Sequence, residues 1–215
     1  MAQWLVELRG HAYDIQILQR YLREEIQVED GKYWLAVTDP ALCEHDAART
    51  RAIRVLALCN AYAQTRMGDL PAVTAGALKS VDEDGRAVDH ITMTAAVWGL
   101  HAGGPPPPPP RETDWWDLAE HDPDVMMALE YWAAPTHTWD SIYRAYEAVE
   151  KTAKAYAVNK WMGEDQRKRF KKTAHYYRHG RPDPVRDCVP MEWDEAYEFV
   201  RRLLGKWLDH KLGSR

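Results

Sequence analysis

The sequence lacks most of the short motifs that identify an enzyme class. It contains no glycine-rich phosphate loop, no GxSxG segment and no HExxH segment, so it gives no sign of a nucleotide hydrolase, a serine hydrolase or a zincin. Its three cysteines, Cys43, Cys59 and Cys188, are too few and too scattered for a disulfide framework. None of them forms a CxxC pair, so a structural zinc site of the usual kind is not expected. The sequence therefore predicts neither a metal nor another cofactor.

Long apolar runs are also missing. No stretch approaches the roughly 18 consecutive apolar residues of a membrane-spanning helix. The first residues contain no basic stretch followed by an apolar one, so no signal peptide is predicted. Together with cysteines that fit a reducing compartment, this composition favours a cytoplasmic protein without a membrane partner.

Phenylalanine is rare as well, and the chain has no net positive charge. The chain has two Phe against ten Trp and eleven Tyr, and its formal net charge is -5. The negative charge argues against attraction to nucleic acid along the whole chain, so any such attraction must come from a local patch. Tryptophan and tyrosine combine an apolar body with one polar atom, which suits the edge of a core and, less commonly, a stacking platform for bases.

The sequence does contain enough apolar material, 46% of all residues, for a core in each half. Residues 1–104 are expected to form a small α/β module, since strand-like alternation, helical spacing and turn residues follow one another along it. Asp30-Gly31 and Asp84-Gly85 predict two hairpin turns, because glycine accepts a positive φ at little cost. The expected elements are a strand over residues 4–8, a helix over 13–24, a hairpin over 26–37, a helix over 47–66 and a hairpin over 72–100.

Gly103-Gly104 and six prolines, Pro105 to Pro110, separate this module from the remainder of the chain. Proline holds φ near the polyproline value and has no amide donor. The prolines are therefore expected to form a stiff spacer about 19 Å long, within a linker over residues 105–112. A docking site for a proline-binding domain is the alternative interpretation.

Residues 113–215 are predicted to form a helical bundle. Asp122-Pro123 is a strong start signal, since aspartate caps a helix and proline takes its first position. Helices are expected over residues 112–120, 123–132 and 164–177 and after residue 190. One apolar stripe over five turns predicts a long helix between them; its members are Trp139, Ile142, Tyr143, Tyr146, Val149, Ala153 and Tyr156. The fold class is thus α+β, with a small N-terminal antiparallel sheet and two helices, a proline linker and a C-terminal helical bundle.

One segment departs from the acidic balance of the chain. Between Lys160 and Arg186 there are nine Lys or Arg against three acidic residues, an excess of six positive charges. Aromatic and histidine residues are interleaved with them, which is the pattern expected of a surface for a phosphate backbone and exposed bases. The alternative is a solvated helix face that happens to be basic. The candidate nucleic-acid-binding residues are Lys168, Lys171, Lys172 and Arg178.

Arg169 and His175 are the candidate catalytic pair within this segment. Histidine can take or give a proton near neutral pH, and arginine can neutralise a phosphate in the transition state. Six positions on one helix correspond to about 600°, or about 240° beyond one turn, so the two do not share a face of a straight helix. Long side chains, or a helix that breaks near Thr173, would be needed to bring both to one cleft.

The C-terminal half resembles a HEPN domain over roughly residues 113–212. Such domains are helical bundles found in many bacterial RNase toxins and phage-defence proteins, and they carry an arginine, a short spacer and a histidine ahead of a final acidic amphipathic helix. Arg169, five further residues and His175 fit that spacing. His179-Gly180, the polar loop after it and residues 191–196 resemble the loop and last helix of the family.

The resemblance implies metal-independent cleavage of RNA by a homodimer in which two such motifs face one another. It leaves open whether His175 or His179 is the catalytic histidine. It also implies that Glu147 or Glu150, on the preceding helix, orients the catalytic pair. The N-terminal module would then be a sensor or would bind a protein partner.

Two weaker metal patterns are present. His175 and His179 share one face of a helix and could bind a metal together with Cys188, but no fourth ligand is found, so no metal is predicted. The acidic run from Asp82 to Gly85 resembles half of a calcium loop, and it is better interpreted as a hairpin turn.

Three functional hypotheses follow. The chain is a HEPN-like ribonuclease or RNA-binding protein, a non-catalytic interaction protein, or a small-molecule enzyme of unknown type. The first hypothesis requires Arg169 and His175 to be exposed and to converge on one groove. The second predicts a buried His175, or the two groups on opposite sides of the helix. The sequence alone leaves open whether the chain is an enzyme.

Overall fold

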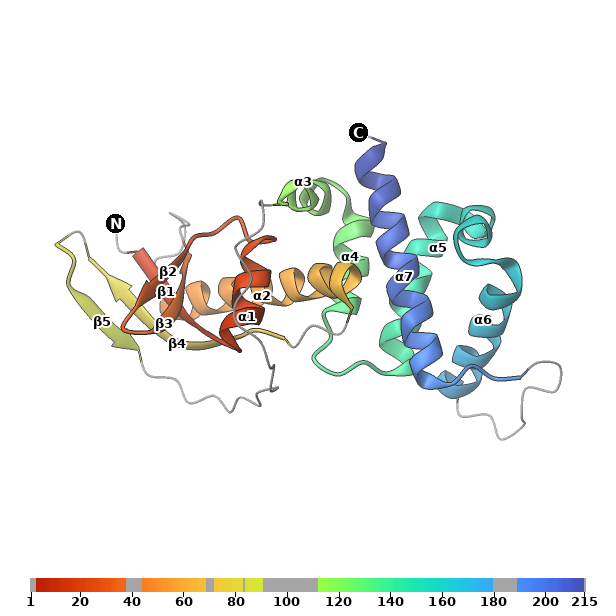
Figure 1. Ribbon diagram of the computed structural model, residues 1–215, viewed down its shortest axis with the longest axis horizontal. Coiled ribbons are helices and arrows are strands. Elements are labelled where there is room, and N and C mark those ends of the chain that lie inside the picture. The colour runs from red at the N-terminus through yellow and green to blue at the C-terminus, as the bar shows by residue number, and fades with distance from the viewer. Residues whose placement is uncertain are drawn as a thin grey trace. The chain divides into compact units, whose positions relative to one another are not determined.

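The computed structural model describes residues 3–37, 44–68, 72–82, 84–90, 112–179 and 189–214 (Figure 1). The chain divides into two compact units, residues 1–63 with 69–113 and residues 64–68 with 114–215. The predicted proline linker and the far part of the second predicted hairpin, residues 91–111, lie outside the described residues. Each unit contains its own buried apolar core.

The first unit contains a five-stranded antiparallel sheet with the strand order β2-β3-β1-β4-β5. The first strand lies at the centre, because one hairpin pairs with each of its edges. The strands are β1 (Gln3–Arg9), β2 (Ile26–Glu29), β3 (Lys32–Val37), β4 (Thr74–Val81) and β5 (Ala87–His90). The predicted antiparallel sheet and the α+β class are confirmed.

Both hairpin turns form at the predicted dipeptides. Asp30 and Gly31 have φ values of 50° and 72°, the left-handed pair that a two-residue turn between twisted strands requires. At the second turn Gly85 has a φ of 79°. The Asp82 carboxylate accepts hydrogen bonds from two amides of this turn, one of them that of Arg86 at 2.8 Å. The acidic run is therefore a hairpin turn, as expected from the sequence.

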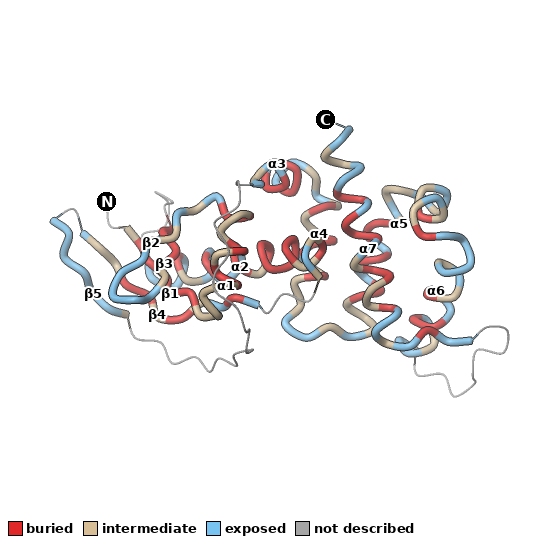
Figure 2. Tube along the Cα trace, in the orientation of Figure 1, coloured by how far each residue is buried: buried red, intermediate tan, exposed pale blue. Residues whose placement is uncertain are grey.

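Two helices, α1 (Ala12–Gln19) and α2 (His45–Met67), complete the core of the first unit. Their apolar faces are buried, as is the alternating apolar face of β1 (Figure 2). Asn60 fixes α2 to the start of β4, because its side chain donates to the Val73 carbonyl at 2.8 Å and accepts from the Val73 amide at 3.1 Å. α1 ends earlier than predicted, and Tyr21 and Leu22 are buried in the turn that follows it.

The second unit is a helical bundle with α5 at its centre, since α5 contacts α4, α6 and α7. Tyr146, Phe170 and Phe199, from α5, α6 and α7, pack their rings together, and Phe170 lies 5.0 Å from each of the other two ring centroids. The helices are α3 (Asp114–His121), α4 (Pro123–Trp132), α5 (Trp139–Met162), α6 (Glu164–His179) and α7 (Trp193–Gly213), and residues 64–68 at the end of α2 join them.

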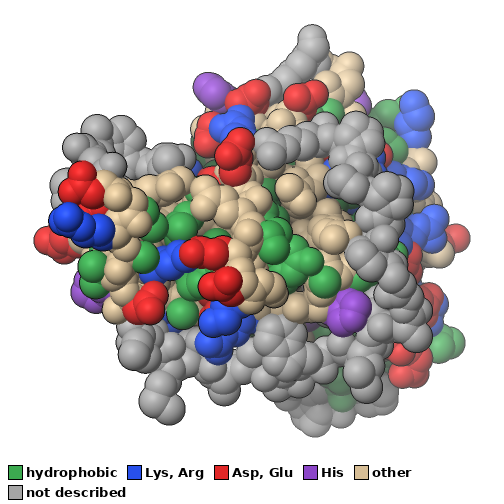
Figure 3. Space-filling model, turned by 60° about the vertical axis from the view of Figure 1, so that its left-hand side comes forward, with side chains coloured by type: hydrophobic (Ala, Val, Ile, Leu, Met, Phe, Trp, Pro, Cys, Tyr) green, Lys and Arg blue, Asp and Glu red, His purple; other side chains and the backbone are tan. Residues whose placement is uncertain are grey.

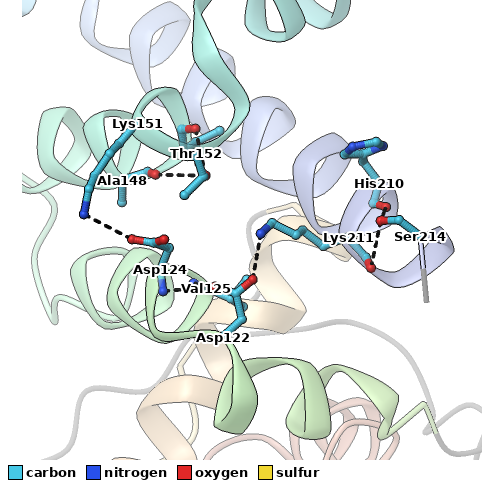
Figure 4. Close-up of polar contacts among 10 residues, drawn as sticks. Asp122, Asp124, Val125, Ala148, Lys151, Thr152, His210, Lys211 and Ser214 are labelled. Carbon is cyan, nitrogen blue, oxygen red and sulfur yellow. Dashed lines mark hydrogen bonds and ion pairs between the residues drawn. The ribbon is translucent and has the colours of Figure 1, made fainter.

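Carboxylates at the start of α4 bond to two other helices (Figure 4). Asp122 caps α4 as predicted, accepting from the amides of Asp124 and Val125 at 3.1 and 3.3 Å. It also accepts from the Lys211 ammonium of α7 at 2.7 Å, and Asp124 lies 3.4 Å from the Lys151 ammonium of α5. Burial raises the pKa of Asp122, but the bond from Lys211 and the two amide bonds outweigh it and hold that pKa below its ordinary value.

α5 is interrupted at Lys154, which has a φ of 61° and a ψ of 158° between two regular helical stretches. The prediction of one apolar stripe over five turns is wrong beyond this point, because the interruption rotates the following turn. Tyr156 is 81% exposed, whereas Val149 is fully buried. Such a backbone is rare for any residue except glycine and costs about 1–3 kcal/mol.

Lys154→Gly is expected to stabilise the protein by about 1 kcal/mol, because glycine adopts a φ of 61° without a clash of Cβ. Urea unfolding followed by circular dichroism measures the change. The matched control is Lys160→Gly, at an exposed lysine in a regular turn of the same helix, which should lose about 1 kcal/mol. Equal losses in the two variants would contradict strain at residue 154.

Candidate functional site

α6 carries the candidate residues, and its buried side fixes the direction of each of them. Phe170, Thr173 and Ala174 are fully buried, so the opposite side of the helix faces solvent (Figure 2). The helix is continuous over its whole length. The break near Thr173 that would bring Arg169 and His175 to one cleft is therefore not found in this described helix.

Arg169 holds the segment that leads into α7. Its Nε donates to the carbonyl of Val189 at 2.7 Å, and its two terminal nitrogens donate to the carbonyl of Pro190 at 2.8 Å and to Glu195 at 2.5 Å. Thr173 supports the same segment, because its hydroxyl accepts from a backbone amide just before α7 at 3.0 Å. Three acceptors use most of the directions in which a planar guanidinium can donate. The position of Arg169 is thus explained by its role in the fold.

His175 is exposed and lies on a different face of α6 from Arg169. Six residues of a continuous helix place the two about 120° apart around the axis. His175 instead continues an outward stripe with Lys168 and Lys172, both of which are exposed. The alternative catalytic residue, His179, is the last residue of α6, and its side chain lies outside the described residues.

Two of the candidate nucleic-acid-binding residues bond to carboxylates of α5. Arg178 lies 3.1 Å from Asp140 and 3.6 Å from Glu147. Lys171 lies 2.8 Å from Glu150. The family resemblance assigned Glu147 or Glu150 to orient a catalytic pair, whereas in the structure both bond to cations that hold α6 against α5.

The basic excess of the α6 segment is largely neutralised by other helices. Seven Lys or Arg stand against two acidic residues between positions 160 and 178. Four carboxylates from α5 and α7 form ion pairs with this segment: Asp140, Glu147, Glu150 and Glu195. Seven positive charges thus meet six negative ones, while Lys168 pairs within the segment with Glu164 at 2.6 Å. So small an excess attracts a phosphate backbone weakly.

Glu150 accepts hydrogen bonds from three side chains of α5 and α6. The Tyr146 hydroxyl donates at 2.6 Å, and Arg167 and Lys171 each donate at 2.8 Å. Arg167 also donates to Asn159 at 2.6 Å. Burial raises the pKa of Glu150, but the bonds from Lys171 and Tyr146 outweigh it and lower that pKa. Burial first, and then the bond to Glu150, raise the pKa of Tyr146, so the phenol stays protonated and donates.

The sequence contained an unused signal for this cluster. Tyr146 and Glu150 are four positions apart, as are Arg167 and Lys171, and residues at this spacing lie on one face of a helix. A face with one carboxylate and a face with two cations on neighbouring helices predict an interhelical ion pair. The interpretation of the cations as a nucleic-acid surface took them as unpartnered.

α5 and α7 begin at the end of the bundle where α6 ends (Figure 1). Partly exposed aromatic side chains of these three helices contact one another there. Trp139 and Tyr177 stack with ring centroids 4.7 Å apart and planes 10° apart, and Trp193 meets Trp139 edge-on at 5.3 Å. Tyr176 meets Tyr177 edge-on at 5.2 Å. Tyr177 is 50% exposed, and the two tryptophans are half-buried. These four residues form the aromatic end, which three helices assemble and which no sequence pattern predicted.

The described residues contain neither a metal-binding cluster nor an exposed thiol. The described part of the chain contains no group of three or more His, Cys, Asp or Glu side chains that could hold a metal ion. Cys188 and the side chain of His179 lie outside it. Cys59 is buried, and burial raises the pKa of its thiol, so it is not a reactive nucleophile.

Of the helices described, none is both long and apolar enough to cross a membrane.

Comparisons with known proteins identify no relative. No protein-family model matches this chain, and no curated protein or solved structure matches it. The HEPN resemblance of residues 113–212 stays a prediction from the sequence.

Glu150→Gln is expected to destabilise the protein by about 2–3 kcal/mol at neutral pH, because Arg167 and Lys171 lose their shared anion in a largely buried site. The folded-state pKa of Glu150 lies below its ordinary value of 4.5. Its contribution is therefore present above that ordinary pKa and is lost as the pH falls through the folded-state pKa. The difference between wild type and variant should shrink over this acid range in urea unfolding.

The matched control for this measurement is Glu147→Gln. Glu147 is 48% exposed and lies 3.6 Å from Arg178, so its loss should cost less than about 1 kcal/mol. Equal effects at the two positions, or a loss at residue 150 that does not change with pH, would show that Glu150 does not organise this contact.

Arg169→Ala is expected to destabilise the protein by about 2–3 kcal/mol, because two carbonyls and Glu195 lose their donor. Hydrogen exchange should accelerate in residues 189–200. Arg169→Lys should restore only part of the stability, since an ammonium cannot reach three separate acceptors. Lys172→Ala, at an exposed position of the same helix, is the control and should stay within about 0.5 kcal/mol of wild type. Arg169→Ala with equally small effects would exclude a structural role for the guanidinium.

Proposed function

We propose that this chain is a non-catalytic protein-interaction module, and that the aromatic end (Trp139, Tyr176, Tyr177 and Trp193) contacts the partner. One observation carries the proposal: Arg169, Lys171 and Arg178 of α6 are bonded to carboxylates of α5 and α7, whereas the ring of Tyr177 stays half exposed. An active site needs its polar groups free to meet a substrate. An interaction surface needs exposed apolar area on a rigid frame.

The composition of the aromatic end suits a protein interface. Tryptophan, tyrosine and arginine contribute a disproportionate share of binding energy at such interfaces. Arg178 follows Tyr177 directly, and its guanidinium lies 5.3 Å from the centre of the Tyr143 ring. The stack between Trp139 and Tyr177 holds both rings in place before a partner arrives, so binding costs little side-chain entropy.

A protein partner fits this surface better than RNA does. Bases stacked on Tyr177 would need cations close by for the adjoining phosphates. Tyr177 and Lys172 are five positions apart on a continuous helix, which separates them by about 140° around the axis. The carboxylates of Asp140 and Glu147 lie against Arg178 beside the rings and would repel a phosphate. RNA binding and RNA cleavage stay predictions from the sequence.

A photo-crosslinking amino acid in place of Tyr177 is expected to capture a discrete protein partner in the native host, because this position is half exposed within the aromatic end. The same amino acid in place of Lys172, on the outward stripe of the same helix, should not capture it. Once the partner is identified, Tyr177→Ala should weaken its affinity by at least about tenfold. Circular dichroism should show an unchanged helical content in that variant.

Two results would contradict the proposal. Equal capture at both positions would show that the aromatic end is not the contact surface. Cleavage of RNA by the purified chain in EDTA, lost in His175→Ala or in His179→Ala, would replace the interaction module with the ribonuclease hypothesis.

A further inference from the structure

The sheet of the first unit has a second face, which carries charged as well as apolar side chains. Leu5, Trp34 and Ala36 form a buried cluster on this face, with Ala77 and Val81 packed against it. Figure 3, turned to bring the sheet side forward, shows acidic and basic side chains next to one another with hydrophobic ones between them. The opposite face carries Trp4, Val6, Leu35 and Leu78, and its polar pair, Ser80 and His90, is hydrogen-bonded at 3.1 Å.

A cavity of about 420 Å³ opens on this second face. Its lining includes Arg9, Glu29, Lys32, Trp34, Lys79 and Asp89. The space arises because β4 and β5 place alanines there, Ala77 and Ala87, beside much larger neighbours. Its volume lies in the range of small-molecule sites in proteins. We call it the sheet-face cavity.

Lys79 is the unusual residue of the sheet-face cavity. Its side chain is only 8% exposed, and its ammonium lies 4.2 Å from the centre of the Trp34 ring. A buried ammonium needs an anion, because removal from water penalises the charged form. Glu29 supplies that anion, yet its side chain is 57% exposed. Glu29 is also the last residue of the edge strand β2.

Asp89, opposite Lys79 on β5, is a second acid of this face, and a third, Glu7, is held very differently from Glu29. Glu7 lies on the central strand and is 13% exposed. It accepts from the Ala77 amide at 3.1 Å and from Arg9 at 3.2 Å, and Lys32 lies 3.7 Å away. Burial raises the pKa of Glu7, but the bonds from Ala77 and Arg9 outweigh it and lower that pKa. Glu7 is therefore a fixed part of the sheet, whereas Glu29 reaches its partner from solvent.

We propose that the sheet-face cavity binds a small carboxylic acid, whose carboxylate replaces Glu29 at the Lys79 ammonium. Glu29 returns to solvent at small cost, because more than half of its side chain is already exposed. The apolar part of the ligand rests against Ala77 and Ala87, in the space that their short side chains leave. This site lies wholly in the first unit, so it does not depend on the protein-interaction function proposed for the second.

The test is a titration of the full chain with benzoate, followed by the backbone amide of Lys79 and the indole N–H of Trp34 in ¹H–¹⁵N spectra. Glu29→Gln should bind benzoate about tenfold more tightly than wild type, because the competing carboxylate is gone. Asp84→Asn is the matched control, since it removes an exposed carboxylate of the other hairpin turn that does not line the cavity, and it should leave the affinity unchanged. Benzamide, a neutral molecule of the same shape, should not bind either protein.

Lys79→Met should abolish benzoate binding while keeping the length and apolar stem of the side chain. Since this variant could fail to fold, the folded Glu29→Gln protein provides an independent test. Binding of benzoate but not of benzamide to it shows that the site requires the carboxylate. Phenyl phosphate is the second probe. Weaker binding of phenyl phosphate than of benzoate supports a carboxylate ligand, and tighter binding would overturn the assignment of a carboxylate as the head group. Glu29→Gln that binds benzoate no better than wild type, or that binds benzamide equally well, would overturn the site.

Discussion

The carboxylate of Glu150 is the interaction on which the packing of α6 against α5 depends. The side chain of Glu150 is 16% exposed, and it accepts hydrogen bonds from the Tyr146 phenol, the Arg167 guanidinium and the Lys171 ammonium. Removal of Arg167 and Lys171 from bulk water would be unfavourable without it, because each would carry an unpaired charge into a half-buried site. The same helix is fastened on its other side by Arg169, which bonds the segment before α7. Charges of α6 thus set the geometry of the bundle, together with the buried ring of Phe170.

Because carboxylates of other helices pair with the cations of α6, a basic segment in the sequence does not by itself indicate a basic surface. A local count of charges along the chain gives an excess that suggests nucleic acid, but the field at the surface depends on every carboxylate that the fold brings near. The partners of Lys171 and Arg178 lie about 20 to 40 positions earlier in the sequence. A window of the length of one helix cannot contain them. Lys168, Lys172 and His175 lie on the exposed side of α6, where Lys168 pairs with Glu164 of the same helix, and this stripe contains no Trp or Tyr.

Much of the fold was predictable because its signals are local. Asp30-Gly31 and Asp84-Gly85 make tight turns wherever they stand between two strands, and Asp122 followed by proline caps a helix in most contexts. The antiparallel sheet follows from two such hairpins. The interruption of α5 was not predictable, since Lys154 is neither glycine nor proline and the apolar stripe continues through it. The structure places Tyr156 in solvent against its own periodicity, because the left-handed φ of Lys154 rotates the turn that follows.

The candidate site was harder to predict than the fold, because it depends on which polar groups the fold leaves unused. Arg169 has the right chemistry for phosphate and the right spacing from His175, yet its donors already meet three acceptors of its own chain. Neither residue type nor spacing reports such an internal partner.

The exposure of the partner acid separates structural ion pairs from displaceable ones. Glu150 and Glu7 are enclosed and accept several bonds each, so an incoming anion would have to break a cluster in order to replace either. Glu29 makes its contact with Lys79 from a largely solvated position at the end of an edge strand. Its return to water restores most of what the contact provides, while the ammonium beneath it still requires an anion. Ligand binding in this chain is therefore expected where a buried cation depends on an exposed acid, and not where cations are most numerous along the sequence.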